Sequence, residues 1–290
     1  MKKMIYLFFK GFIMGIANII PGVSGGTLAI ILGIYEDFIN AISHFFSDFK
    51  KNILFLLPVF LGMGVAILSM SNVISFSYKH IPIATTLFFV GLVLGGIPLL
   101  TKKLKESKGN KKSIINYLIF VLTFALVIFM ALADTIFSGI GDINLTKITI
   151  IKGIILFFVG IIAAGTMVIP GVSGSLVLML LGFYYPIIDT IKDLIHFNHL
   201  FSNVIVLGIF GIGVLVGIIG ISKLFEYLFK KQETKTYFGV LGFIYASILA
   251  IPYSALHSLE IKFHYYEIII AILLFILGMV IAYFLGDKKD

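Results

Sequence analysis

The sequence predicts an all-α polytopic membrane protein, built from two inverted-topology repeats of about five helical segments each. Three observations predict this fold. The 290-residue chain is 60% hydrophobic and only 12% charged, and its mean hydropathy is +1.12. A soluble domain of this size cannot bury so much apolar surface. Long apolar runs recur along the chain, and the pentapeptide PGVSG occurs twice, each time interrupting such a run.

The apolar segments follow one another with short polar breaks and no long linker. Their even spacing and length exclude a transmembrane barrel. A helical arm of about 17 residues reaches roughly 25 Å, just short of a hydrocarbon core about 30 Å thick. Length alone therefore does not decide whether the arms beside each PGVSG span the membrane or turn back within it. The segments cover residues 4–20, 27–46, 53–78, 82–101, 113–138, 150–169, 175–195, 203–222, 236–257 and 265–286.

The repeat extends well beyond the pentapeptide. A constant offset of 149 residues aligns Pro21-Gly22-Val23-Ser24-Gly25 with Pro170-Gly171-Val172-Ser173-Gly174. The same offset aligns Gly33-Ile34-Tyr35 with Gly182-Phe183-Tyr184, and the glycine pair at 62 and 64 with that at 211 and 213. A match of this length indicates duplication. We therefore expect a first transmembrane repeat over residues 1–145 and a second, inverted repeat over residues 146–290.

The distribution of lysine predicts the orientation. If the segments on either side of each PGVSG return the chain to its starting side, each half crosses the membrane an odd number of times. With both termini cytoplasmic, sixteen of the 22 basic residues then lie inside and five outside, as the positive-inside rule requires. Treating each broken pair as a single crossing helix spoils this bias. The inside lysines are Lys2, Lys3, Lys50, Lys51, Lys102, Lys103, Lys105, Lys108, Lys111, Lys112, Lys223, Lys230, Lys231, Lys235, Lys288 and Lys289.

The two PGVSG loops have the chemistry of an anion site. Proline stops a helix, and glycine permits positive φ. A hydroxyl residue then stands where a new helix begins, at Ser24 or Thr27 in the first copy and at Ser173 or Ser175 in the second. Several N–H groups would face the ligand at the positive end of a helix dipole. Inverted halves would bring the two loops together near the middle of the bilayer.

Ionisable residues inside apolar segments are the next candidates. Glu36 and Asp37 lie in an apolar arm after the first loop, and Asp189 lies in the corresponding arm of the second half. Carboxylates inside a membrane mark ion paths or lie at its interface, so these three are candidates for coupling to H⁺ or Na⁺. Lys10, within the first segment, either reaches the cytoplasmic surface or attracts an anionic headgroup.

Composition also limits the chemistry. The chain has no cysteine, and all 22 basic residues are lysine, so bidentate arginine recognition of phosphate is excluded. The six histidines show no ligand spacing, and we expect no metal, no cofactor and no nucleotide-driven step. The net charge of +8 is typical of lysine-rich cytoplasmic loops, so no nucleic-acid partner is expected. The sequence does not indicate an oligomeric state.

With PGVSGGT in the first half and PGVSGSL in the second, the chain resembles the DUF368 family of bacterial membrane proteins over essentially its whole length. The resemblance implies a multi-pass protein of the plasma membrane. It also implies a polyprenyl-phosphate transporter that returns undecaprenyl phosphate from the outer to the inner leaflet for cell-envelope synthesis. The headgroup site implied by the family pattern comprises Gly22, Ser24, Gly25, Gly26, Thr27, Gly171, Ser173, Gly174 and Ser175.

Two alternatives remain. The undecaprenyl-pyrophosphate phosphatase family also has inverted repeats, but its motif resembles PGxSRS with an essential arginine, and it carries an ExxxE cluster. Here Gly25 and Gly174 occupy the arginine position, and no ExxxE occurs. We therefore expect transport without hydrolysis and no enzyme activity. The second alternative is a secondary transporter of a small soluble anion.

Overall fold

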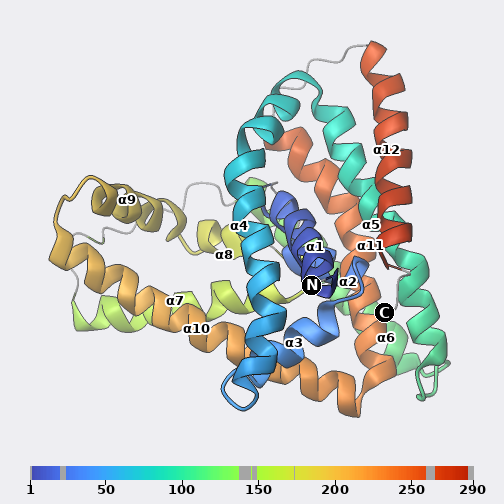
Figure 1. Ribbon diagram of the computed structural model, residues 1–290, viewed down its shortest axis with the longest axis horizontal. Helices are drawn as coiled ribbons and strands as arrows, with labels where there is room; N and C mark the ends of the chain where they lie inside the picture. The colour runs from blue at the N-terminus through green and yellow to red at the C-terminus, as the bar shows by residue number, and fades with distance from the viewer. Residues whose placement is uncertain are drawn as a thin grey trace.

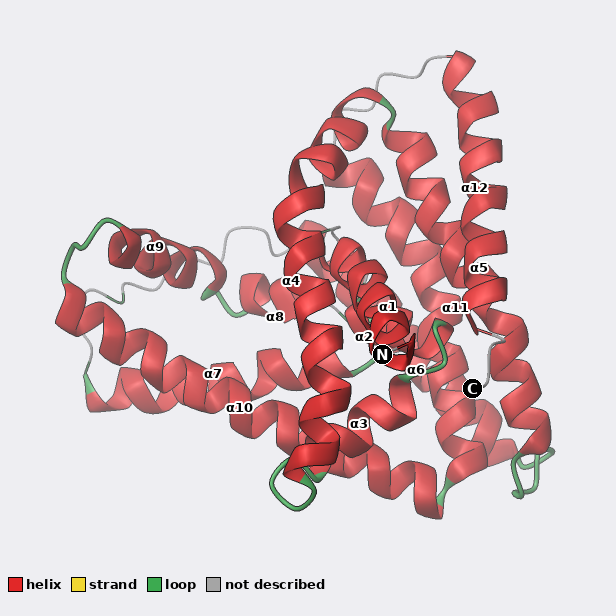
Figure 2. Ribbon diagram, in the orientation of Figure 1, coloured by secondary structure: helices red, strands yellow, loops and turns green. Residues whose placement is uncertain are grey.

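The computed structural model describes residues 2–19, 24–136, 145, 149–172, 174–258 and 265–286. Every regular element in these ranges is a helix, as the sequence predicted (Figure 2). The helices are α1 (Lys2–Asn18), α2 (Gly25–Ile31), α3 (Tyr35–Ser43), α4 (Phe49–His80), α5 (Pro82–Glu106), α6 (Ile114–Ile136), α7 (Ile150–Val168), α8 (Gly174–Leu180), α9 (Tyr184–Ile195), α10 (Leu200–Lys231), α11 (Glu233–Ser258) and α12 (Tyr265–Gly286).

Two of the ten predicted segments are each divided into a pair of short helices. The arm after the first PGVSG breaks between α2 and α3, where Gly33 has φ +70°. The arm after the second breaks between α8 and α9, where Gly182 has φ +74°. A left-handed residue cannot continue a right-handed helix, and glycine adopts that conformation most easily. The chain therefore turns after only about two helical turns in both α2 and α8.

Seven of the described helices are long and apolar enough to cross a membrane: α4, α5, α6, α7, α10, α11 and α12. Helices α4 and α10 have 32 residues each and extend about 48 Å at 1.5 Å per residue. Helix α1 has 17 residues, and the helices that follow the PGVSG loops, α2 and α8, are shorter still. The chain is therefore a multi-pass membrane protein.

Close glycine contacts pair α1 with α4. A Cβ on Gly11 would lie 2.1 Å from the Val59 carbonyl oxygen, and one on Gly15 would lie 2.5 Å from that of Met63. Because both residue numbers rise together, α1 and α4 are parallel. The intervening α2 and α3 must therefore return the chain to the side on which α1 begins.

Helices α7 and α10 repeat this arrangement in the second half. Gly153 faces Ile209, and Gly165 faces Ile221, so this pair is parallel as well. A Cβ on Gly213 would lie 2.2 Å from the Phe157 carbonyl oxygen, a contact that only glycine permits. In the first half a Cβ on Gly62 would lie 2.1 Å from the Phe8 carbonyl oxygen, whereas a Cβ on Gly64 or Gly211 would meet nothing within 4 Å.

The remaining long helices pair across the two halves. Helix α5 packs along α12, and α6 packs along α11 (Figure 1). A Cβ on Gly91 of α5 would lie 2.2 Å from the Phe275 carbonyl oxygen of α12. In the repeat, α5 corresponds to α11 and α6 corresponds to α12. The α5–α12 pair of one arrangement therefore corresponds to the α11–α6 pair of the other. This pattern is compatible with the predicted pair of repeats.

The two pairs of short helices, α2–α3 (the first hairpin) and α8–α9 (the second hairpin), differ in their surroundings. Helix α2 packs on α5, and α3 packs on α10 of the other half. Among the described residues, no comparable packing joins α8 to α11 or α9 to α4. In Figure 1, α9 lies at the far end of the α7–α10 pair, away from the bundle that surrounds α1 and α2. In the described parts of the chain, α3 packs on the other half, whereas α9 packs on α8 and α10 of its own half.

Candidate functional site

The first PGVSG loop leads into α2 through a capped helix start. Ser24 is the N-cap of α2, and its Oγ accepts the N–H of Gly26 at 3.2 Å. Of the two hydroxyl residues that the sequence offered as caps, Ser24 therefore has this role. Ser24 and Thr27 are both buried, at 5% and 1% exposure. Gly22 lies outside the described residues.

The second loop makes a glycine turn at the end of α7. Gly171 has φ +77°, and a Cβ there would lie 2.9 Å from the Phe243 carbonyl oxygen of α11. Both the conformation and the space require glycine. Gly174 begins α8, and a Cβ on it would lie 2.8 Å from the Ala163 carbonyl oxygen. Ser173 and the side chain of Ser175 lie outside the described residues.

The two loops contact each other directly. The Thr27 hydroxyl accepts the backbone N–H of Gly171 at 2.7 Å. The Ser24 hydroxyl donates to the Ile169 carbonyl oxygen over a long 3.5 Å. A Cβ on Gly26 would lie 2.8 Å from the Val168 carbonyl oxygen, so the backbones also approach closely. Residues 144 or more positions apart in sequence thus form one polar cluster.

A third hydroxyl joins this cluster from α3. The Tyr35 hydroxyl donates to the Val168 carbonyl oxygen at 3.0 Å. The last carbonyls of a helix have no partner within it, so Tyr35 and Ser24 together satisfy the broken end of α7. The sequence analysis did not identify Tyr35 as part of the site. Its place in the repeated Gly-x-Tyr segment, opposite Tyr184, was the available signal.

The cluster has the groups that a phosphate needs. Backbone N–H groups and hydroxyls can surround an anion without a permanent positive charge. The Thr27 hydroxyl and the Gly171 N–H now bond to each other, and an anion oxygen placed between them would accept from both. The groups that join the two halves here are therefore of the kind that can bind an oxyanion.

Lys10 approaches the first hairpin and not the cytoplasmic surface. Its side chain is only 4% exposed, and its Nζ donates to the Leu32 carbonyl oxygen at 2.6 Å. The ammonium group also lies 4.3 Å from the centre of the Tyr6 ring. A cation beside the last carbonyls of a helix stabilises that helix end. Lys10 thus fixes the turn at which α2 ends.

The candidate carboxylates have different surroundings. Glu36, in the first turn of α3, accepts from Lys103 of α5 at 2.6 Å and from the Tyr237 hydroxyl of α11 at 2.7 Å. Asp37 is exposed beside it. Asp189 is exposed on α9 and forms an ion pair with Lys192 at 3.0 Å. Of the three, Glu36 alone joins helices from both halves in the described contacts.

A second polar contact connects the other end of α3 to α10. His44 Nδ1 lies 3.5 Å from Glu226 Oε2, and Glu226 also forms an ion pair with Lys230. Lys230 is one of the lysines that the sequence places on the cytoplasmic side. The first hairpin is therefore held at both ends, by Glu36 and by His44. No group of three acidic or histidine side chains in the described ranges could hold a metal ion.

The fold and the site define a multi-pass helical membrane protein in which two broken helices meet in a buried cluster of hydroxyl and amide groups. Residues 14–267 match the VCA0040-like family, described as undecaprenyl phosphate translocase-like. The chain belongs to this family. The family resemblance inferred from the doubled motif is thus confirmed.

Two curated relatives are both named polyprenyl-phosphate transporter. The chain is 33% identical to a polyprenyl-phosphate transporter of Staphylococcus aureus over 283 residues, 96% of this chain and 94% of the relative. It is 28% identical to a polyprenyl-phosphate transporter of Vibrio cholerae over 251 residues, 81% of this chain and 74% of the relative. No solved structure matches the chain. The family and the relatives are named for translocation and transport, which confirms the expectation of a transporter and not an enzyme.

Proposed function

We propose that the chain transports a polyprenyl phosphate, undecaprenyl phosphate, across the bacterial plasma membrane, with the phosphate held between the two PGVSG loops. The observation that carries this proposal is the 2.7 Å contact between Thr27 and the Gly171 N–H, because it brings the two repeated loop regions into direct contact. The names of the family and of both relatives support the choice of lipid.

The lipid and the site are physically compatible. A single phosphate can be bound by N–H groups and hydroxyls, which suits a chain without arginine. Its apolar tail can stay in the hydrocarbon while only the headgroup crosses. A charge at the bilayer centre is costly, so the protein must supply the polar path. The buried cluster of Ser24, Thr27, Tyr35 and Gly171 lies where such a path would cross between the halves.

The mechanism that we propose is alternating access by two inverted halves, residues 1–145 and 146–290. The parallel α1–α4 and α7–α10 pairs support an odd number of crossings in each half. The packing of α3 on the other half and of α9 on its own half supports a state closed toward the cytoplasm and open toward the outside. With no nucleotide-binding motif in the sequence, a gradient of H⁺ or Na⁺, the membrane potential or the substrate gradient would supply the energy.

Transport in liposomes tests this proposal. The purified chain is reconstituted, and movement of undecaprenyl phosphate between leaflets is measured for wild type, Ser24→Ala and Thr27→Val. We expect wild type to transport the lipid and both variants to lose at least about tenfold, because each loses a hydroxyl whose hydrogen bond to a charged phosphate contributes about 1.5–3 kcal/mol. Ser77→Ala is the matched control, since its hydroxyl bonds only to its own helix at Val73.

Three results would count against the proposal. Normal transport by both variants would remove the loops from the site. Transport of inorganic phosphate in place of the lipid would favour a small-anion transporter. Steady release of phosphate from undecaprenyl pyrophosphate would favour the phosphatase alternative.

A further inference from the structure

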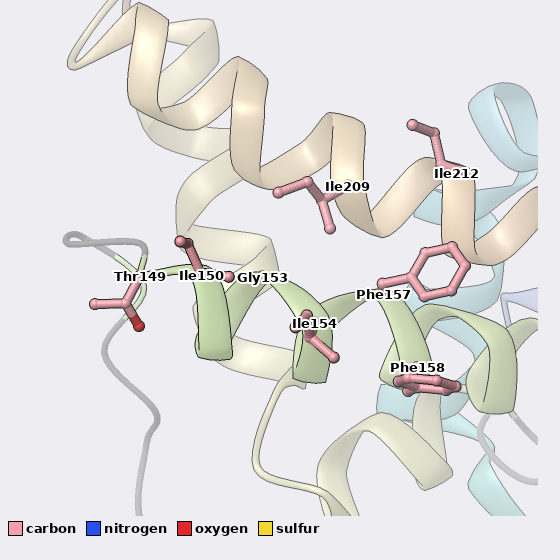
Figure 3. Close-up of a pocket in the computed structure, with 8 residues that line it drawn as sticks. All are labelled: Thr149, Ile150, Gly153, Ile154, Phe157, Phe158, Ile209 and Ile212. Atoms are coloured by element: carbon pink, nitrogen blue, oxygen red, sulfur yellow. The ribbon is translucent and has the colours of Figure 1, made fainter.

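A groove of about 680 Å³ runs between α7 and α10, on the part of the pair that lies farthest from the PGVSG loops (Figure 3). Its walls are aliphatic and aromatic, with Ile154 and Phe158 from α7 and Ile209 and Ile212 from α10. Thr149, the N-cap of α7, is the polar residue among the eight that line it. No charged side chain belongs to this lining. The groove therefore suits an apolar ligand.

The groove exists because α7 carries glycine where a side chain would fill it. Gly153 faces Ile209, and a Cβ at Gly153 would be in ordinary contact with Ile209 Cδ1 at 3.5 Å. The 149-residue offset places Met4 and Phe60 at the equivalent positions of the first half. Both of those side chains are larger than their counterparts. The second helix pair thus has less side-chain volume at these two positions than the first.

The position of the groove connects it to the site between the loops. Helix α7 carries the groove on residues 149–158 and ends at Val168, whose carbonyl accepts the Tyr35 hydroxyl of the polar cluster. Ten residues of helix separate Phe158 from Val168, a distance of about 15 Å. Both α7 and α10 are membrane-spanning helices, so the groove opens to the hydrocarbon. A lipid whose phosphate lies at the cluster would reach this surface with the part of its tail about 15 Å or more from the phosphate.

We propose that the α7–α10 groove binds the isoprenoid tail of the transported lipid, over a part of the tail that lies about 15 Å or more from its phosphate. This inference rests on the proposed function, since it assigns the tail of the same substrate to a second part of the molecule. The apolar walls stabilise the tail by burial, at roughly 25 cal/mol for each Å² removed from other contacts, and Gly153 leaves the space. Selection of a branched isoprenoid over straight acyl chains then depends on the shape of the groove.

Photo-crosslinking tests the groove directly. A polyprenyl phosphate with a diazirine on an isoprene unit about 15–25 Å along the tail from the phosphate is incorporated into liposomes that contain the intact protein. We expect labelled peptides from residues 149–158 and 209–212, with labelling suppressed by unlabelled undecaprenyl phosphate and not by an equal amount of phosphatidylglycerol. Equal suppression by both lipids would identify ordinary annular lipid and overturn the proposal. Labelling confined to other helices would overturn it as well.

A filled-groove variant gives an independent measurement. Gly153→Met introduces the side chain that the first half has at this position, and we expect it to reduce both the specific crosslink and the apparent affinity for undecaprenyl phosphate at least about tenfold. Gly220→Met is the matched control, because nothing lies within 4 Å of a Cβ at Gly220. Unchanged transport and crosslinking in a folded Gly153→Met would overturn the proposal.

The two proposals fail in different ways. If wild type does not transport the lipid, the proposed function fails, and the competition experiment still decides whether the groove holds an isoprenoid. If wild type transports normally and Gly153→Met does so with the same affinity, the groove inference fails while the transporter remains. Crosslinking of wild type does not depend on whether the variant folds.

Discussion

Single hydroxyl and carboxyl groups determine how this chain can break helices inside a membrane. An unpaired backbone group in hydrocarbon costs several kcal/mol, so each broken helix end needs a partner. The end of α7 finds Tyr35 and Ser24, and the end of α2 finds Lys10. The start of α5 finds a carboxylate from α12, since Glu267 accepts the N–H groups of Ile83 at 2.6 Å and Ala84 at 3.1 Å.

Glu267 gives the clearest stability prediction. It is 1% exposed, and its removal would leave two buried N–H groups at the positive end of α5 without an acceptor. We expect Glu267→Ala to lower the free energy of unfolding by about 2–3 kcal/mol, and Glu267→Gln, which keeps an acceptor, to lower it less. Thermal unfolding of the purified protein in detergent measures this. Asp189→Ala, an exposed control, should change stability by no more than about 0.5 kcal/mol. Equal melting of Glu267→Ala and wild type would contradict the capping role.

Glu36 is the carboxylate to which we assign ion coupling. Its ion pair with Lys103 is partly exposed, so Glu36→Gln should cost less than about 1 kcal/mol of stability. We expect the variant to lose the stimulation of transport by an imposed proton gradient, because Gln cannot release a proton. Transport with and without the gradient, compared with Asp37→Asn and Asp189→Asn, measures this. Full stimulation in Glu36→Gln together with its loss in either control would move the coupling role to that control.

The sequence was sufficient for part of the site. Two identical loops at a constant offset indicated Ser24, Thr27 and the glycines, and the contact with Gly171 brings those loops together. Tyr35 and Glu267 could not be identified in this way. Their partners lie 133 and 184 residues away, and no local pattern shows which backbone groups a fold will leave unpaired.

At the level of helices, hydrophobic patterning predicted the long spans and missed the breaks in the short ones. Segments 27–46 and 175–195 are apolar on both sides of Gly33 and Gly182, so hydropathy alone does not separate α2 from α3 or α8 from α9. A lone glycine within an apolar run is often tolerated in a membrane helix. The repetition of Gly-x-Tyr at both positions was the feature that distinguished them.

Gly33 offers a test of the hairpin as an element. At φ +70° an alanine is strained, and its Cβ would lie 3.3 Å from the Gly286 carbonyl oxygen. We expect Gly33→Ala to lower the free energy of unfolding by about 1–2 kcal/mol. Gly64→Ala is the matched control, since a Cβ there meets nothing within 4 Å, and it should be neutral or slightly stabilising. Thermal unfolding of both variants decides this, and similar behaviour would exclude a strained turn at Gly33.

At the scale of the whole molecule, the two hairpins differ in the contacts that fix them to the rest of the protein. The first hairpin is fixed to the other half at Glu36, at His44 and at the polar cluster. The second contacts mainly its own half and α6. If the second hairpin became the fixed one and the first became free, the polar cluster would be exposed to the opposite side. For this exchange the contacts of α3 would have to break while equivalent contacts form around α9. The duplicated sequence makes such an exchange physically reasonable, because both halves have the same core elements.

Cysteine accessibility tests this asymmetry in a chain that has no cysteine of its own. Ile42 and Ile191 are equivalent under the 149-residue offset, yet Ile42 is 7% exposed and Ile191 is 39% exposed. We expect an impermeant maleimide to label Ile191→Cys from outside at least about ten times faster than it labels Ile42→Cys from the cytoplasmic side, since a closed state favoured by about 1.4 kcal/mol gives that ratio. Ser47→Cys, in the exposed loop after α3, confirms that the reagent reaches the cytoplasmic side.

A double variant tests what holds α3 in place. Combining Ile42→Cys with Glu36→Ala should raise the labelling at position 42, because Lys103 and Tyr237 then lose their partner on α3. Equal labelling of the two isoleucine positions would contradict an outward-open state, and labelling of Ile42→Cys alone would reverse it.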